Sequence, residues 1–224
     1  MNAGRAVLLV GSARPQGESS SEALGGYLLA RLDEGGMDLE VFHVGRCQRP
    51  GKERRLLQAV DGAVLFVLAT PLYVDALPYL VTRCLERIAA HRAAVPHRTG
   101  TRFLALVNCG FPEWEHTRVA LDICRAFARQ AGFRWAGGLG LGGGEAIGGR
   151  PLYGLGGRAR HVRRGLDLAA EALLAGRDVP EQAQALLARP MIPSRIYTVI
   201  ASIRWLRAGR RHGTLRRLRD RPLE

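Results

Sequence analysis

Short aliphatic runs alternate along this chain with segments of helical periodicity, and this alternation is the feature that most constrains its fold. We expect buried β-strands at residues 6–11, 39–44, 63–70, 103–108 and 135–141. Strands separated by helical segments predict an α/β fold, in which a parallel sheet is covered by helices on both faces. The 224 residues are enough to bury one such core, so a second full domain is not needed.

Four of the intervening segments carry apolar residues at helical spacing, so each is predicted to be a helix with one buried face. Together the strands and helices complete a doubly wound domain, which we place at residues 1–178. The predicted buried faces are Leu24, Tyr27, Leu28 and Leu32; Leu77, Leu80, Val81, Cys84, Leu85 and Ile88; Val119, Ile123 and Phe127; and Val162, Leu166, Ala169 and Leu173.

Residues 179–224 are predicted to form a basic, helical C-terminal extension. A polar helix is expected after Pro180 and should end near Arg189, and Pro193 opens a second helical segment with one apolar face. That face consists of Ile196, Val199, Ile200, Ile203 and Leu206. We expect it to pack on its own domain or on a second subunit. A surface of anionic lipid is the alternative, because arginines flank the apolar face.

The stretch 137–157 is rich in glycine and is taken to follow the last predicted strand. Glycine loses much conformational freedom when it is fixed inside a helix or strand. We therefore predict a loop here, which could cover a bound ligand.

Composition and charge limit the classes of function. The net charge is +13, but Lys52 is the only lysine, and an arginine-rich, glycine-rich composition weakens any inference of nucleic-acid binding. The four cysteines are far apart, without the spacing of a zinc or cluster site, which indicates reduced thiols in a cytoplasmic protein and no metal. The apolar run at 62–81 is broken by Pro71, Asp75 and Pro78, so no membrane span is predicted.

The loop after the first strand is predicted to bind an anion. It runs from Gly11 through Arg14 to a cluster of three serines, Ser19–Ser21, at the start of a helix. Free backbone N–H groups and the helix dipole favour a phosphate there, and Arg14 can add a charge-assisted hydrogen bond. The alternative is that Ser19 or Ser20 only caps the helix, with Glu22 completing a capping box. This loop has neither of the phosphate-binding patterns GxxxxGK[ST] and GxGxxG.

Three loops taken together carry a resemblance to a known family. Gly11-Ser12-x-Arg14 precedes the serine cluster, Thr70-Pro71-Leu72-Tyr73 leads to Pro78 after the third strand, and Asn108-Cys109-Gly110-Phe111 follows the fourth. Over about residues 5–176 the chain resembles the NADPH-dependent FMN reductases, which have a flavodoxin-like fold. This resemblance implies a five-stranded sheet of order 2-1-3-4-5, with FMN across the carboxyl ends of the strands and NADPH or NADH as co-substrate.

The resemblance also implies roles for individual residues. The first loop would hold the phosphate, the second would cradle the ribityl chain and the isoalloxazine, and the third would close the other side. The residues implied are Ser12, Arg14, Ser19, Ser20 and Ser21 for phosphate; Pro71, Leu72, Tyr73 and Val74 for the ring and chain; and Asn108, Gly110 and Phe111 for the far side.

The sequence also departs from the family. Ala13 stands where proline is common, and Val74-Asp75 where many members have tryptophan or glycine. Cys47 stands alone, which gives no support to an iron-sulfur cluster. Glu113, Trp114, His116 and Glu145 are the side chains that we expect to touch a substrate.

The function implied is an FMN-dependent NAD(P)H oxidoreductase that reduces a small acceptor such as a quinone, an azo compound or a flavin. No protein acid or base is required, because the cofactor performs hydride transfer. A homodimer is expected from the resemblance, and nucleic acid is not an expected partner. Two alternatives remain open: a non-catalytic flavodoxin-type electron carrier, and a flavin-free scaffold of the same fold.

Overall fold

A single parallel sheet forms the centre of the protein, in a computed structural model that describes residues 4–217 and 220. Its strands are β1 (Arg5–Val10), β2 (Asp38–His43), β3 (Leu65–Pro71), β4 (Arg102–Asn108) and β5 (Arg134–Leu141). They lie in the order β2-β1-β3-β4-β5, with neighbouring strands parallel. The predicted fold class and strand order are therefore confirmed.

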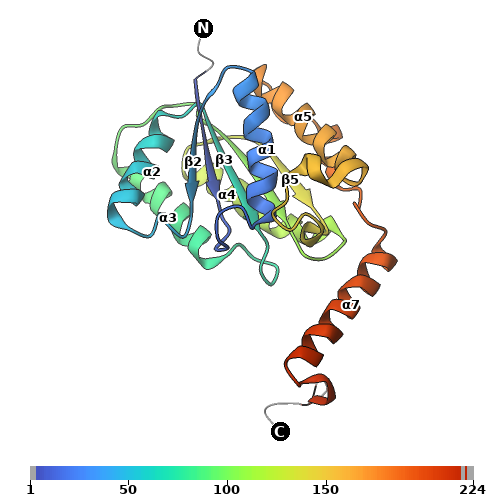
Figure 1. Cartoon of the computed structure of the whole chain (residues 1–224). Coiled ribbons are helices and arrows are strands. Elements are labelled where there is room, and N and C mark those ends of the chain that lie inside the picture. Colours follow the sequence, from blue (N-terminus) through green and yellow to red (C-terminus); the bar gives the residue numbers. More distant parts are fainter. Residues whose placement is uncertain (1–3, 218–219, 221–224) are drawn as a thin grey trace.

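Helices cover both faces of the sheet (Figure 1). The helices are α1 (Ser20–Glu34), α2 (Pro50–Gly62), α3 (Tyr79–Ala94), α4 (Arg118–Gln130), α5 (Arg160–Leu174), α6 (Glu181–Leu187) and α7 (Ser194–Arg211). Helices α1, α5 and α6 share one core cluster with the sheet, and α2, α3 and α4 share the other. Short 3-10 turns lie at 114–117, 144–146, 152–159 and 215–217. No helix within the described residues has the length and apolarity that crossing a bilayer requires.

The predicted buried faces of α1, α3 and α5 are confirmed, whereas that of α4 is confirmed for Phe127 and wrong for Val119 and Ile123. Val119 and Ile123 are 58% and 42% exposed, and the residues of α4 that are buried are Ala120, Cys124, Phe127 and Ala128. Small side chains let α4 approach β4 and β5 closely. The helix is therefore turned so that its alanines, Cys124 and Leu121 face the sheet, while Val119 and Ile123 face outward.

The prediction that all of 137–157 is a loop is also wrong, because Gly137, Gly138 and Gly140 belong to β5. A Cβ atom on Gly140 would lie 2.2 Å from Thr117 Oγ1. Glycine is thus required by close packing, and this benefit outweighs its entropic cost in a strand. The side chain of Gln184 in α6 accepts a hydrogen bond from the N–H of Gly140 at 2.6 Å and donates one to its C=O at 3.2 Å. These two bonds satisfy the backbone polar groups of Gly140 at the outer edge of β5.

The sequence-based division at residue 178 separates α6 from the helix on which it packs. Ala183 and Leu187 of α6 are fully buried in the core cluster of α5. By contrast, α7 extends away from the body (Figure 1), and its apolar face is exposed rather than docked on its own domain. Residues 218, 219 and 221–224 of the predicted extension lie outside the described residues.

A buried arginine ties α3 to the loop before β5, at the end of the sheet opposite the carboxyl edge. Arg92 is 3% exposed, its Nε donates to Ala131 O at 2.8 Å, and its guanidinium carbon lies 4.1 Å from the centre of the Phe133 ring. Asp61 balances its charge, with Oδ1 at 3.8 Å from Arg92 Nη1.

We predict that Arg92→Met destabilises the protein by about 2 kcal/mol, because the change removes the charge-assisted hydrogen bond to the Ala131 carbonyl and leaves His91 as the partner of Asp61. Urea unfolding followed by circular dichroism measures the difference. Arg83→Ala, on an exposed part of the same helix, should change stability by less than about 0.5 kcal/mol. Equal stability of the Arg92 variant and the wild type would contradict this role.

Candidate functional site

The carboxyl ends of the strands place the predicted site loops next to one another. Val10 of β1 pairs with Ala69 of β3, Pro71 pairs with Asn108 of β4, and Asn108 pairs with Leu141 of β5. The loops that follow these strands therefore emerge side by side, at the edge where open α/β sheets bind ligands.

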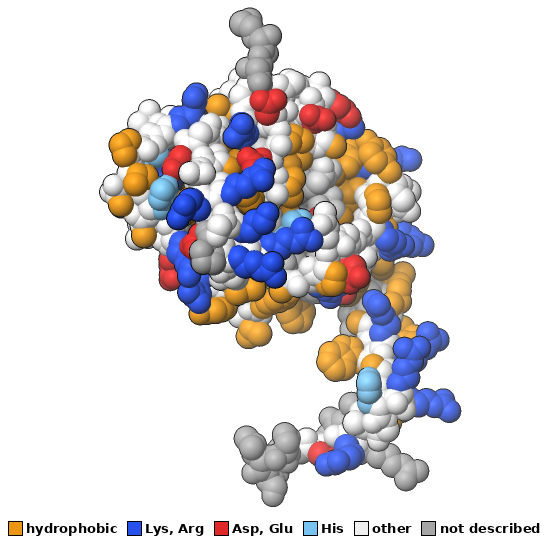
Figure 2. All heavy atoms as spheres, turned by 60° about the vertical axis from the view of Figure 1, so that its left-hand side comes forward, with side chains coloured by type: hydrophobic (Ala, Val, Ile, Leu, Met, Phe, Trp, Pro, Cys, Tyr) orange, Lys and Arg blue, Asp and Glu red, His pale blue; other side chains and the backbone are white. Residues whose placement is uncertain are grey.

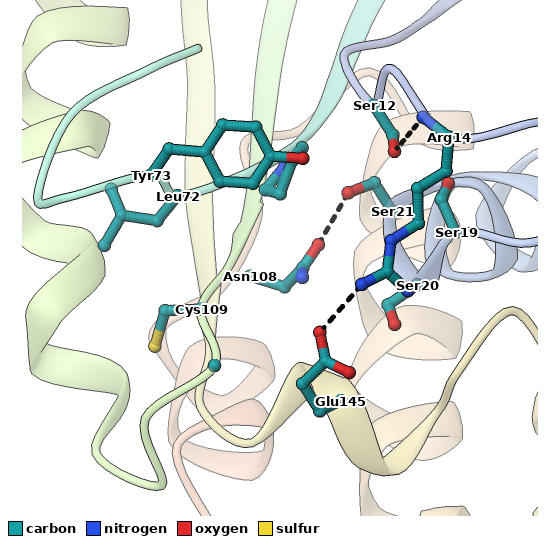
Figure 3. A pocket seen from close by; sticks show the side chains of 12 residues that line it. Ser12, Arg14, Ser19, Ser20, Ser21, Leu72, Tyr73, Asn108, Cys109 and Glu145 are labelled. Carbon is teal, nitrogen blue, oxygen red and sulfur yellow. Dashed lines mark hydrogen bonds and ion pairs between the residues drawn. The ribbon is translucent and has the colours of Figure 1, made fainter. Parts of the chain in front are cut away.

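One pocket at this edge brings together ten of the twelve predicted site residues (Figure 3). The serines and Arg14 lie on one side, Leu72 and Tyr73 on the other, and Asn108 lies between them. The predicted residues that line the pocket are Ser12, Arg14, Ser19, Ser20, Ser21, Pro71, Leu72, Tyr73, Asn108 and Gly110, and Cys109 and Glu145 complete the lining.

The start of α1 is capped as predicted, although the capping box is only half formed. Ser19 Oγ accepts a hydrogen bond from the N–H of Glu22 at 3.1 Å. The Glu22 carboxylate does not return to Ser19; it accepts from the N–H of Gly17 at 2.7 Å and so holds the first loop closed. Ser19 thus caps the helix and lines the pocket at once, so the two sequence-based alternatives are compatible.

The four serines differ in what they can offer to an anion. Ser20 Oγ donates to Gly144 O and Ser21 Oγ donates to Asn108 Oδ1, both at 2.7 Å, so their protons are engaged. Ser12 Oγ and Ser19 Oγ act as acceptors, from the N–H groups of Arg14 and Glu22, and each keeps its proton for a further bond.

The first turn of α1 adds backbone donors. Within residues 4–217 and 220, no acceptor bonds the N–H groups of Ser20 and Ser21. Groups of this kind at a helix start favour an anion, and the helix dipole adds to the attraction. The donor set therefore fits a phosphate monoester.

A single ion pair spans the anion side of the pocket. Arg14 Nη2 lies 3.2 Å from Glu145 Oε1, and both side chains are about half exposed (Figure 3). Glu145 belongs to the glycine-rich segment after β5, which also packs on the first loop: a Cβ atom on Gly149 would lie 2.6 Å from Gly17 O. This segment closes the anion side of the pocket, not the side of Tyr73.

The other side of the pocket offers an apolar surface. Leu72 is largely buried, and the Tyr73 ring is 48% exposed beside it. Burial raises the pKa of the Cys109 thiol, which therefore stays protonated and bonds the backbone carbonyl of Phe111 or Glu113 at 3.4 Å. Cys109 follows Asn108 at the end of β4, and this position alone could have placed it at the site.

Two predicted ligands do not line the pocket. Val74 is 98% exposed, and Phe111 is 58% exposed, with the centre of its ring 4.7 Å from that of the tilted His116 ring. Of the four residues expected to touch a substrate, only Glu145 lines the pocket; Glu113, Trp114 and His116 do not. Within the described ranges, no group of His, Cys, Asp or Glu side chains is arranged to hold a metal ion.

A residue of the extension also reaches the site. Tyr197 of α7 donates from its hydroxyl to Gly110 O at 2.7 Å. Burial, and then the negative charge of Glu145, raise the pKa of Tyr197, so its hydroxyl stays a neutral donor. No local sequence signal connects Tyr197 with a loop 87 residues earlier, and sequence analysis did not find it.

This sheet order, with a pocket at its carboxyl edge, defines the flavodoxin-like fold. No family model matches the chain, and no curated protein matches its sequence. Solved structures share this fold, among them an NADH:FMN oxidoreductase, RosB and a flavone reductase. The apo form of the NADH:FMN oxidoreductase EMOB is 18% identical, with 85% of this chain and 96% of that chain covered and a TM-score of 0.57. RosB with a bound flavin intermediate is 13% identical, with 89% of this chain and 86% of that chain covered and a TM-score of 0.55. A flavone reductase is 13% identical, with 75% of this chain and 64% of that chain covered and a TM-score of 0.55.

These similarities confirm the predicted flavodoxin-like fold. At identities this low they establish the architecture alone, and the activity has to be argued from the pocket.

The turn between Tyr73 and Ala76 is strained at the mouth of the pocket. Tyr73 and Ala76 bond each other through both backbone N–H groups, at 3.0 and 3.2 Å, and the two residues between them have positive φ: 49° for Val74 and 59° for Asp75. A β-branched residue is unfavourable in this left-handed region, whereas asparagine is tolerated.

We predict that Val74→Asn raises the free energy of unfolding by about 1 kcal/mol, because it relieves this strain and removes no buried contact. Thermal unfolding measures the gain, which should appear as an increase of roughly 2–4 °C in Tm. Val95→Asn, at a partly exposed valine with φ of −128°, should give no such gain. A lower Tm for the Val74 variant would show that the turn is not strained by valine.

Proposed function

We propose that the protein is a flavin-dependent oxidoreductase that binds FMN at the carboxyl edge of the sheet, oxidises NADPH or NADH, and reduces a small acceptor. The observation that carries this proposal is the pocket itself, in which phosphate donors and an apolar, aromatic surface face each other across Asn108. A phosphate at one end and a flat ring at the other are what FMN presents.

The phosphate would be held by the first loop and the start of α1. Ser12 and Ser19 have hydroxyl protons to donate, the first turn of α1 has free N–H groups, and Arg14 supplies positive charge. Ser20 and Ser21 have another role in this arrangement. Through Gly144 and Asn108 they fix the loops after β5 and β4 in position around the donors.

The ring would lie against Leu72 and Tyr73, with Gly110 on the far side. When bound, FMN accepts a hydride and passes electrons on, so the chain need only bind and orient the flavin and its partners. The protonated Cys109 thiol and the neutral Tyr197 hydroxyl hold the loop after β4 and need not exchange protons with a substrate.

We further propose that the protein is a homodimer. Val119 and Ile123 of α4 are exposed apolar residues beside a groove between α3 and α4. A second subunit on this surface would bury Val119 and Ile123, the apolar residues that the helical spacing of α4 predicts to be buried.

Flavin content and activity test the proposal directly. Protein purified with added FMN should show flavin absorbance, and it should oxidise NADPH or NADH when menadione is the acceptor. Protein that stays colourless in excess FMN would overturn the proposal. Bound flavin without any oxidation of NADPH or NADH would favour the electron carrier.

Two substitutions should move FMN affinity in opposite directions. Arg14→Ala removes a charge-assisted bond to phosphate and should weaken FMN binding about fivefold to tenfold. Glu145→Gln frees Arg14 from its carboxylate partner and should strengthen FMN binding by a few fold, the scale of an exposed ion pair.

Fluorescence titration with FMN and with riboflavin measures both effects. Riboflavin has no phosphate, so its affinity should be the same in both variants as in the wild type. Arg129→Ala is the matched control, because it removes an exposed arginine at the end of α4, away from the pocket. It should leave the affinities for FMN and riboflavin unchanged. Parallel changes in riboflavin affinity would show that Arg14 does not contact the phosphate.

A further inference from the structure

Helix α7 stands apart from the body on the side of the carboxyl edge (Figure 1). The Tyr197 hydroxyl, bonded to Gly110 O, fixes its first turns beside the pocket. Apolar side chains along the helix are about half exposed. The exposed fractions are 53% for Ile196, 58% for Val199, 45% for Ile200, 44% for Ile203 and 48% for Leu206.

The two sides of α7 face different surroundings. Tyr197, Ala201 and Trp205 recur every four residues on one side and line a groove whose other wall includes Gly110 and Glu145. Ile196, Val199, Ile203 and Leu206 lie at the spacing of the opposite side and do not line that groove. We call these four residues the outer stripe. The outer stripe has no partner within the described residues.

The charge on this helix is of one sign. Five arginines lie along it, and between Glu181 and Asp220 the sequence has no acidic residue. Figure 2 shows arginine and hydrophobic side chains together along the projecting helix. Arg207 follows Ile203 by four residues and Arg210 follows Leu206 by four, so the outer stripe ends in positive charge. The arginines are Arg195, Arg204, Arg207, Arg210 and Arg211.

We propose that α7 binds the surface of an anionic lipid bilayer, lying in the plane of the headgroups with the outer stripe among the acyl chains. The arginines would reach the lipid phosphates while their aliphatic stems stay beside the apolar residues. A second copy of the helix is a poorer occupant, because two such stripes packed together bring arginines against arginines. Anionic lipid complements both the apolar residues and the charge.

Vesicle co-sedimentation of the full-length protein tests the proposal. Vesicles of equal parts phosphatidylglycerol and phosphatidylcholine should bind the protein at least tenfold more tightly than vesicles of phosphatidylcholine alone. Val199→Ser/Ile203→Ser should weaken binding to the anionic vesicles roughly tenfold, because it removes the centre of the outer stripe. Ala201→Ser/Ala208→Ser is the matched control, because it adds two hydroxyl groups to the same helix outside the outer stripe. It should have little effect on binding to the anionic vesicles.

A second pair of variants separates local from overall charge. Arg207→Gln/Arg210→Gln/Arg211→Gln should weaken binding to anionic vesicles roughly tenfold to a hundredfold. Arg125→Gln/Arg129→Gln/Arg158→Gln removes three exposed charges elsewhere and should have a much smaller effect. Equal loss in both triple variants, or no vesicle binding by the wild type, would overturn the proposal.

Light scattering after size-exclusion chromatography tests the competing occupant. The Val199/Ile203 variant should keep the oligomeric state of the wild type in the absence of lipid. A change to a smaller species would assign the outer stripe to a second copy and overturn the proposal. All of these measurements are independent of flavin, so failure of the proposed redox function would leave them unaffected.

Discussion

Burial of the sheet on both faces is the constraint on which the rest of the structure depends. The side chains of β1, β3 and β4 are almost all inaccessible to water, so these strands have little room for polar chemistry along their length. Polar groups can be placed only where the strands end. The parallel arrangement brings the carboxyl ends of all five strands to one edge, and the serines, Arg14, Asn108 and Glu145 gather there.

Much of the fold and of the site could be predicted from sequence, because both depend on periodicity and on strand ends. Apolar runs and helical spacing identified every strand and the buried faces of α1, α3 and α5. The failures have a common cause. Which face of α4 is buried, and why β5 contains glycines, both depend on how closely two elements approach each other, as at Gly140 and Thr117. The order of residues in the sequence does not give that distance.

The same limit applies at the pocket. Arg14 could be predicted because it lies in the loop between a strand and a helix start, and the family resemblance implied Ser12 and Asn108. The resemblance also implied Val74 as a ligand, but Val74 has a left-handed backbone, is almost completely exposed and does not line the pocket. The pairing of Arg14 with Glu145 joins residues 131 positions apart, and that of Tyr197 with Gly110 joins residues 87 apart. Only the folded chain shows either contact.

The carboxylate beside Arg14 also affects how an anion would reach the pocket. Seen from farther away than a Debye length, about 8 Å at physiological ionic strength, the two opposite charges cancel and exert little long-range pull. Close to the helix start, the N–H groups and hydroxyls remain as short-range donors. The Arg14–Glu145 pair would therefore add little to electrostatic steering, and an anion would be recognised here through short-range hydrogen bonds.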